Sequence, residues 1–317
     1  MKFSRKNLLI TGLFFLLAMC FLLQAKKTAE FAYIGLKTWF ETMIVSLFPF
    51  MVLMNLMIRS GFSHLFIRPF YTLLRPVMKN SPEAVFVIFF GFLCGFPLGA
   101  KCAIDFYKKG QISKDNAEYL LSFSNNIGPA YMLGFFVAVI KPECPLWIMF
   151  FCCYGIPFLY GVLLRHTFYR HILDKEYKRA LVTDPLSVHP GQILFVLPDA
   201  VSDALTQIAS LGGYMVLFNA LRIVPHILFK HISTLYVITH SLLEISGGLL
   251  CVQTFVSERV MKLLCLFAVF SFNGICCHFQ TFALMQGTSL SRQKYMLHKI
   301  ILCSITVLTV WIYLQTR

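Results

Sequence analysis

Charged residues are scarce in this 317-residue chain: Asp, Glu, Lys and Arg make up 13% of it, whereas hydrophobic residues make up 58%. Acidic residues are fewest, with 14 Asp and Glu against 28 Lys and Arg. Such a composition is far from that of soluble domains. Several apolar stretches approach the ~20 residues that a helix needs to cross a bilayer. The composition therefore predicts an all-α polytopic membrane protein with little room for a soluble domain.

Signatures of common enzymes and metal sites are also missing. The sequence has no H-E-x-x-H, G-x-S-x-G, Walker A or G-x-G-x-x-G motif, so we expect no enzyme and no cofactor. The 11 cysteines are an odd number and lie mostly in apolar stretches, which favours packing over a disulfide framework. Cys276, Cys277 and His278 lack the spacing of a zinc site, and we expect no metal. The basic residues lie between apolar segments, which indicates membrane topology and anionic lipid contact and not nucleic acid.

The distribution of Lys and Arg bears on how many apolar segments cross the membrane. The segments are 8–25, 38–58, 84–100, 119–140, 146–164, 193–221, 232–250, 261–283 and 299–314. If all nine cross from a cytoplasmic N-terminus, only 13 of the 28 basic residues lie inside, against the positive-inside rule. If 84–100 and 232–250 enter and leave on one side, 19 of the 28 lie inside. The charge pattern thus favours two re-entrant segments.

Two stretches of sequence recur in the same order, which predicts an internal repeat. Residues 51–57 match 215–221 at four of seven positions, and residues 123–126 match 270–273 at three of four. In the re-entrant topology each half crosses the membrane three times, so the second half is expected to be inverted relative to the first. Chance similarity between Phe-rich and Leu-rich regions is the alternative.

Glycine and proline interrupt both re-entrant segments. These residues weaken a helix, and broken backbone at membrane depth persists only where protein or a watery cavity satisfies its polar groups. We therefore expect a broken helix in each half, with close backbone approach at its glycines. The residues concerned are Gly95, Pro97, Gly99 and Lys101 in the first half, and Gly247 and Gly248 in the second.

The chain is accordingly divided into four parts. Residues 1–30 form an N-terminal anchor helix, which we expect to be uncleaved because its apolar run is long and no cleavage site precedes Lys26. Residues 31–172 form the first repeat, 173–191 a cytoplasmic linker and 192–317 the second repeat. Within the first repeat, Gly110 separates two short helices, and Ser113 is placed to cap the second of them.

Polar residues at membrane depth are the candidate pathway. Two carboxamides in hydrocarbon are costly unless their donors and acceptors are paired. They could hold a base, a sugar or a hydrated ion, or they could join helices by hydrogen bonds. The first group is Asn125, Asn126, Gly128 and Pro129, and the second is Asn273, His278 and Gln280.

Glu244 is the strongest single candidate, because an acidic residue inside a membrane segment is costly and usually belongs to an ion, proton or substrate site. Ser246 follows it, and His240 precedes it by one helical turn, so that His240 and Glu244 could meet on one helix face. A neutral structural hydrogen bond between the two is the alternative. If the chain transports, Asn126, Asn273 and Glu244 are expected to surround one cavity.

Two strings carry a family resemblance. Gly95 to Lys101 reads Gly-Phe-Pro-Leu-Gly-Ala-Lys, and 125–129 reads Asn-Asn-Ile-Gly-Pro. They resemble the sporulation integral membrane proteins of the YlbJ type, within the "nucleoside recognition" or Gate group, and the likeness covers roughly Leu36 to Leu302. The resemblance implies an inner-membrane protein that supports spore formation. Two functions stay open: a transporter or channel for a small polar solute or ion, and a scaffold for other sporulation membrane proteins.

Overall fold

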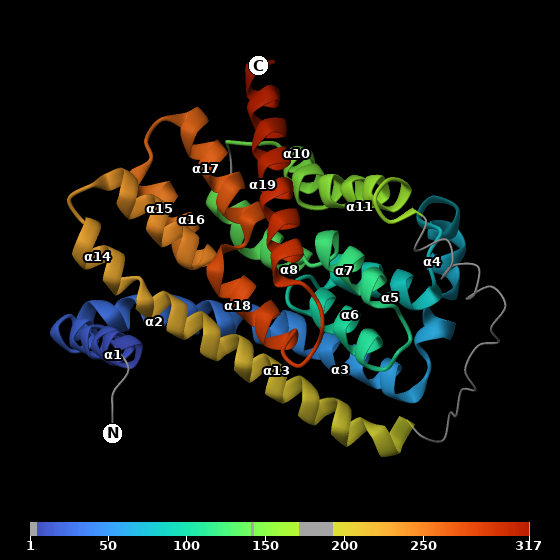
Figure 1. Ribbon diagram of the computed structural model, residues 1–317. Helices are drawn as coiled ribbons and strands as arrows, with labels where there is room; N and C mark the ends of the chain where they lie inside the picture. The colour runs from blue at the N-terminus through green and yellow to red at the C-terminus, as the bar shows by residue number, and fades with distance from the viewer. Residues whose placement is uncertain (1–4, 141–142, 171–192, 317) are drawn as a thin grey trace.

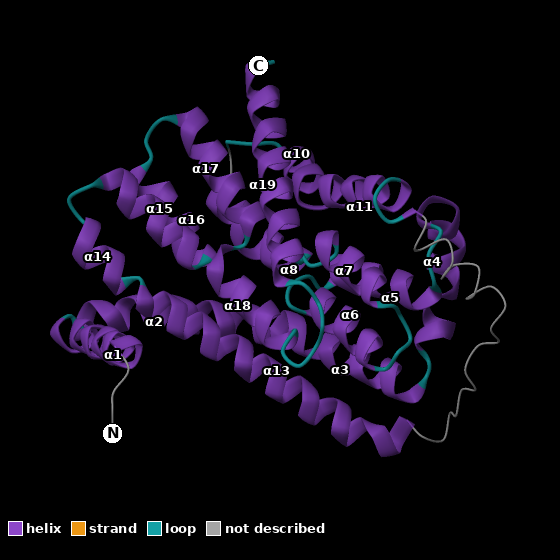
Figure 2. Ribbon diagram, in the orientation of Figure 1, coloured by secondary structure: helices purple, strands orange, loops and turns teal. Residues whose placement is uncertain are grey.

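A computed structural model describes residues 5–140, 143–170 and 193–316, and the regular structure in these ranges is entirely helical (Figures 1 and 2). Six helical stretches in them are long and apolar enough to cross a membrane by length and composition. They are Arg5–Leu23, Ala25–Ser60, Leu146–His166, Ile193–Phe229, Arg259–Leu284 and Arg292–Gln315. The predicted fold class, an all-α multi-pass membrane protein, is confirmed. The predicted linker, 173–191, lies outside the described residues.

The first half runs from α1 to α11. Its elements are α1 (Arg5–Leu23), α2 (Ala25–Thr38), the π-helical η1 (Trp39–Ile44), α3 (Val45–Ser60), α4 (Ser63–Met78), α5 (Pro82–Leu93), α6 (Leu98–Lys108), α7 (Lys114–Phe123), α8 (Pro129–Tyr131), the π-helical η2 (Met132–Phe136), α9 (Val137–Ile140), α10 (Leu146–Phe150), the π-helical η3 (Phe151–Gly155) and α11 (Ile156–His166).

The second half has fewer and longer elements. They are α13 (Ile193–Leu221), α14 (Ile223–Phe229), α15 (Ser233–Leu243), α16 (Ile245–Phe255), α17 (Arg259–Phe272), α18 (Gly274–Leu284) and α19 (Arg292–Gln315). The order of these elements resembles that from α2 to α11. In the second half it is a long helix (α13), a short helix (α14), a hairpin (α15 and α16), a broken helix (α17 and α18) and a closing helix (α19). The inverted relation of the two halves stays a prediction.

Local sequence signals explain where several helices begin. The Ser113 hydroxyl accepts a hydrogen bond from the Asn116 backbone N–H (O···N 3.1 Å) and so caps α7, as the sequence predicts. Gly110, just before it, has φ +69°, a left-handed conformation that glycine adopts without steric cost. Ser81 caps α5 in the same way as Ser113 caps α7.

Both hairpins return to the end of the molecule from which they start. Asn80 precedes α5 and Asn116 begins α7, and their side chains exchange two hydrogen bonds (N···O 3.3 and 3.0 Å). In the second hairpin, the ring of Tyr236 in the first turn of α15 lies 5.2 Å from that of Phe255, the last residue of α16. These contacts place the entry and exit of each hairpin close together. Whether either hairpin re-enters the membrane stays a prediction.

A separate group of contacts joins loops away from the first hairpin's open end. Arg259, at the start of α17, donates to the Glu143 carbonyl before α10 (N···O 3.2 Å). Lys262 lies 3.8 Å from the Glu143 carboxylate. These loops lie at the top of Figure 1, whereas α4 and the start of α5 lie on its right.

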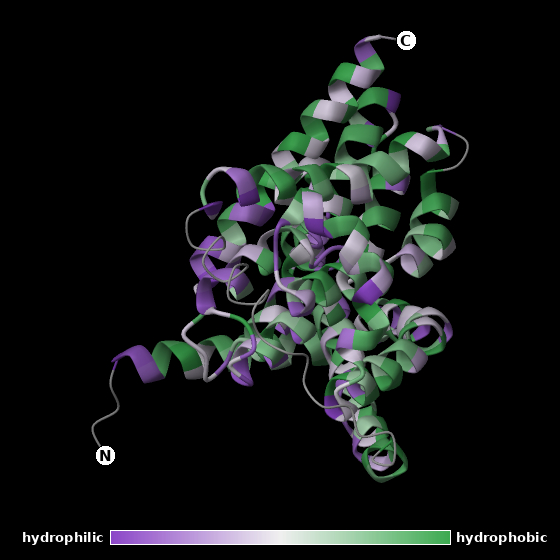
Figure 3. Ribbon diagram, turned by 90° about the vertical axis from the view of Figure 1, so that its right-hand side faces the viewer, coloured by the Kyte–Doolittle hydropathy of each residue, from purple (hydrophilic) through white to green (hydrophobic). Residues whose placement is uncertain are grey.

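Helix α1 stands apart from the packed helices. None of its residues is buried, and it projects from the rest of the molecule (Figure 3). Its surface is apolar except near its free end, where hydrophilic residues gather. An unburied apolar helix suits a lipid environment, and its role as a membrane anchor stays a prediction.

Candidate functional site

Four helix interruptions carry the candidate residues. They separate α5 from α6 at 94–97, α7 from α8 at 124–128, α15 from α16 at Glu244, and α17 from α18 at Asn273. Two interruptions come from each half of the chain. Where a helix stops inside a membrane protein, its end groups need partners in the surrounding protein. The contacts described next supply these partners.

Glycines let the first hairpin pack directly on the interruption after α7. A Cβ atom at either Gly91 or Gly99 would overlap the carbonyl oxygen of Ser124. The two glycines also face each other, since a Cβ at Gly99 would lie 3.0 Å from the Gly91 Cα. A side chain at either position would therefore force the two backbones apart.

The turn of the hairpin lies on the same interruption. Gly95 has φ +76°, and a Cβ there would overlap the backbone of Gly128. The N–H of Phe96 donates to the Asn126 carbonyl (N···O 2.5 Å). Pro97, whose peptide bond with Phe96 is cis, directly precedes α6. The close backbone approach expected at Gly95 and Gly99 is thus present.

Asn125 joins the two halves of the chain. Its side-chain oxygen accepts from the N–H of Ala100 (O···N 3.3 Å) in the first half. Its side-chain nitrogen donates to Thr281 Oγ1 (3.1 Å) and to the Tyr295 hydroxyl (3.3 Å) in the second half. The carboxamide is fully buried and its groups are paired, so it holds the bundle together.

Lys299 of α19 lies against the interruption after α7 and is fully buried. Its ammonium donates to the Asn125 carbonyl (N···O 2.5 Å) and to Asn126 Oδ1 (3.0 Å). The Asn126 side-chain nitrogen in turn donates to the carbonyl of Phe123, the last residue of α7. The carbonyl end of a helix is the negative end of its dipole, which stabilises a cation there. Asn126 therefore links this cation to the helix end.

Glu244 ends α15 and caps α16. It is 4% exposed, and its extended backbone (φ −153°, ψ 142°) breaks the helix. Its carboxylate accepts from the Ser246 hydroxyl (O···O 3.2 Å) and from the Gly247 N–H (O···N 3.0 Å). His240 hydrogen bonds instead to the Tyr236 carbonyl (N···O 2.9 Å). The proposed meeting of His240 with Glu244 required one continuous helix, and the helix stops between them.

The two glycines after Glu244 make room for neighbouring helices. A Cβ at Gly247 would overlap the guanidinium of Arg222, and one at Gly248 would lie 2.6 Å from the Ser241 Cα. Arg222 is 4% exposed and donates to Asn219 Oδ1 and to the Gly247 carbonyl (both 3.1 Å). The second hairpin is therefore packed around a buried guanidinium.

Asn273 forms the last interruption, in a left-handed conformation (φ 74°). A Cβ at the following Gly274 would lie 3.4 Å from the Glu244 Cα, so this interruption touches that of the second hairpin. Asn273 is 2% exposed, and its side-chain nitrogen has no hydrogen-bond partner among the described residues. It lines a small cavity together with Asn126 and Ile127.

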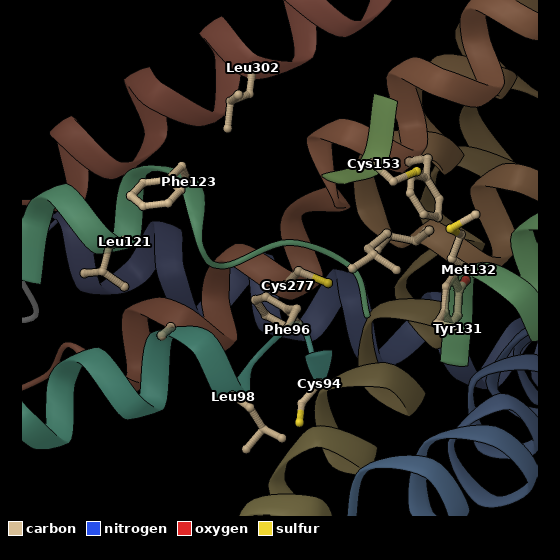
Figure 4. Close-up of a cluster of buried hydrophobic side chains, with 14 of the residues drawn as sticks. Cys94, Phe96, Leu98, Leu121, Phe123, Tyr131, Met132, Cys153, Cys277 and Leu302 are labelled. Atoms are coloured by element: carbon tan, nitrogen blue, oxygen red, sulfur yellow. The ribbon is translucent and has the colours of Figure 1, made fainter. Parts of the chain in front are cut away.

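A central cavity lies where the interruptions meet. It is bounded by both hairpins, the segment after α7, α13 and α18. Its walls are Met43, Ser46, Leu47, Cys94, Phe96, Ile127, Gly128, Ala130, Tyr131, Leu211, Met215, Glu244, Ile245, Cys276, Cys277 and Gln280. Figure 4 shows Cys94, Phe96, Tyr131 and Cys277 around this region. Asn126 and Asn273 thus share one cavity, Glu244 lines its neighbour, and Ile127 lines both.

The other candidate residues differ in their surroundings. Gln280 lines the central cavity and donates to Cys276 Sγ (N···S 3.3 Å), whereas its buried side-chain oxygen has no hydrogen-bond partner in the part of the chain that the structure describes. His278 instead hydrogen bonds to the Tyr295 hydroxyl (3.1 Å). Pro129 is the first residue of α8, where its missing N–H costs nothing.

Further cavities continue from the central one towards the loops. Lys101, which pairs with Asp105, lines two of them, and Leu211 and Gln280 are shared between the nearer one and the central cavity. The outermost cavity reaches Arg59, whose guanidinium pairs with Asp203 (N···O 2.6 Å). Shared lining residues therefore place the three cavities next to one another.

The buried cations Lys299 and Arg222 were not predicted from the sequence, because both were counted among the Lys and Arg residues of the loops. Lys299 lies two turns inside α19, which begins at Arg292. Ser291, which caps this helix, is the signal that could have revealed its start. In the described ranges, no group of three or more His, Cys, Asp and Glu side chains could hold a metal ion.

Comparison with known proteins gives one informative similarity. The chain is 26% identical over 237 residues to the sporulation integral membrane protein YlbJ of Bacillus subtilis (strain 168). The match covers 69% of this chain and 57% of YlbJ, so the chain spans little more than half the length of this relative. The similarity confirms the resemblance predicted from the sequence. No family model and no solved structure matches the chain.

Proposed function

We propose that this chain is a multi-pass protein of the bacterial cell membrane that moves a small polar solute or ion in support of spore formation. The printed description of YlbJ supports the link to sporulation. The excess of Lys and Arg in alternate loops supports a cytoplasmic N-terminus. Movement of a solute, as in Gate-type proteins, is inferred from the site.

The observation that carries the proposal is the buried carboxylate of Glu244 in the wall of the central cavity. A carboxylate at membrane depth is costly and is retained mostly at ion or substrate sites. Here it lies among helix interruptions from both halves of the chain. Broken helices from two halves around one cavity are the arrangement by which many transporters bind their substrates.

The neighbouring cavities support a route from this site to one face. It runs from Glu244 past Gln280 and Lys101 to the ion pair of Arg59 with Asp203. Polar and charged residues along such a route stabilise a solute that would be insoluble in lipid. The Arg59–Asp203 pair is placed to open or close its outer end.

Flux of candidate solutes into liposomes that contain the purified protein tests the proposal. We expect Glu244→Gln, which keeps the shape and removes the charge, to abolish flux while leaving abundance near normal. Glu41→Gln is the matched control, because the Glu41 carboxyl is 61% exposed and lies outside the cavity. A purely structural Glu244 would instead show its loss as reduced abundance.

The alternative function, a membrane scaffold for other sporulation proteins, has one supporting observation. Lys108 and Lys109 are exposed, as is Lys114 at the start of α7, at the open end of the first hairpin. A wild-type protein that conducts none of the solutes tested, and that is captured with the same membrane proteins when Glu244 is replaced by Gln, would favour the scaffold.

A further inference from the structure

We propose that the central cavity binds a small monovalent cation of the alkylammonium kind. The inference rests on the proposed transport function and narrows its substrate class. Three features carry it: the hydrogen-bonding groups that face the cavity, the character of its walls and its size.

The donors of two wall residues are already engaged, since the Tyr131 hydroxyl pairs with that of Ser246 (O···O 3.0 Å) and the Gln280 nitrogen donates to Cys276 Sγ. Acceptors remain: the Glu244 carboxylate, and the side-chain oxygen of Gln280, which has no hydrogen-bond partner among the described residues. The Ser46 hydroxyl donates a hydrogen bond to the Thr42 carbonyl (O···O 2.6 Å), so that only its lone pairs remain available to a ligand. A carboxylate that accepts only one hydrogen bond on each oxygen still has lone pairs to spare, and such acceptors favour a ligand that brings its own N–H groups.

The charge in the wall is negative and unpaired. Among the described residues, no Lys, Arg or His lines the cavity, and no basic group lies within 4.0 Å of the Glu244 carboxylate. The buried guanidinium of Arg222 acts on Glu244 only at longer range, because it lies beyond Gly247 and donates to Asn219 and to the Gly247 carbonyl. A buried carboxylate without a direct ion-pair partner attracts a cation and repels carboxylates and phosphates.

The remaining wall is apolar and aromatic. The rings of Phe96 and Tyr131, together with the sulfur atoms of Met43 and Met215, form part of it. Aromatic faces stabilise cations that shed their water readily, of which alkylammonium ions are the best known. Strongly hydrated divalent ions need several oxygen ligands, which this wall does not offer.

Size separates the alkylammonium ion from larger solutes. The cavity has room for about four water molecules, counting ~10–15 Å³ of accessible space for each. A methylammonium ion fits this space. A nucleoside is several times larger and would require the walls formed by Phe96 and Tyr131 to move apart.

Binding to the full-length protein in detergent tests the proposal, with methylammonium chloride as probe and sodium acetate and uridine as comparisons. We expect methylammonium to bind and to raise the thermal stability of the wild type, and acetate and uridine to have no effect. Glu244→Gln should weaken methylammonium binding about tenfold or more. Glu41→Gln should bind like the wild type. Phe96→Leu leaves the Glu244 carboxylate and its capping of α16 unchanged, and it should weaken methylammonium binding severalfold. This variant tests the proposal if Glu244→Gln does not fold.

Absence of methylammonium binding, equal affinity in wild type and Glu244→Gln, or stabilisation by uridine alone would each overturn the cation site. These results differ from failure of the transport proposal. Methylammonium binding without flux in liposomes would refute transport and keep the cation site. Flux of a neutral solute without methylammonium binding would refute the cation site and keep the transport proposal.

Discussion

The packing of Gly99 against Ser124 leads to a quantitative prediction. Gly99 in α6 and Gly213 in α13 both lie inside helices, so that replacing either by Ala gains about 0.5–1 kcal/mol of helix propensity. A Cβ at Gly213 meets nothing within 4 Å, and only this gain remains. A Cβ at Gly99 overlaps the Ser124 carbonyl oxygen, which is backbone and cannot rotate away.

Overpacking of this kind costs about 1–3 kcal/mol. We therefore expect Gly99→Ala to be less stable than Gly213→Ala by about 1–3 kcal/mol, because the propensity gain is common to both variants and only the clash differs. Gly91 faces the same carbonyl oxygen, so that both changes displace one group. The double variant Gly91→Ala/Gly99→Ala should accordingly cost less than the sum of the single variants.

Reversible unfolding of the purified protein in mixed micelles measures these differences, with abundance in the membrane as a second readout. Equal stability of Gly99→Ala and Gly213→Ala would refute the close packing of the hairpin on the interruption after α7. Fully additive costs for Gly91→Ala and Gly99→Ala would show that the two glycines do not share one neighbour.

Further predictions concern the buried cation, the last interruption and the topology. Lys299→Met should destabilise the protein by about 1–3 kcal/mol in the same unfolding assay, because it leaves two buried acceptors unpaired while it removes a buried charge. Asn273→Gly should be tolerated and Asn273→Val should cost about 1–2 kcal/mol, since a left-handed conformation suits Gly and not a β-branched residue; equal stability would contradict the assigned φ. In a cysteine-free background, a thiol at Lys108 should be labelled from the cytoplasm and one at Ser257 from outside; labelling of both from one side would refute the re-entrant topology.

The interruption after α5 could be predicted from the sequence because it has a local cause. Pro97 and Gly95 limit the backbone on their own, and Ser113 caps a helix through a neighbour three residues away. Such effects act within one turn of chain and are visible in one sequence. In the second half the break was expected at Gly247 and Gly248, but both lie inside α16 and the helix stops at Glu244 instead. The direction in which the hairpins enter the membrane stays a prediction from the distribution of Lys and Arg.

The partners of the polar residues could not be predicted in this way. Asn126 pairs with Lys299, and Gly247 makes room for Arg222, across distances in sequence that no local pattern encodes. The expected contact of His240 with Glu244 assumed a regular helix, and the break that separates them is made by Glu244 itself as a cap. Propensity and spacing therefore locate the interruptions, whereas tertiary packing decides which of their groups are free to face a ligand.

The pairing of Lys299 with the segment after α7 has a consequence for biogenesis. The carbonyl of Asn125 and the carboxamide of Asn126 lie in the first half, and the ammonium that satisfies them belongs to α19, 173 and 174 residues further along the chain. During synthesis at the membrane, the carbonyl of Asn125 and the carboxamide oxygen of Asn126 therefore lack this hydrogen-bond donor until α19 has been inserted. A ribosome stalled before α19 should leave an intermediate with this segment sensitive to protease or in contact with an insertase, and its release should mark the completion of the fold.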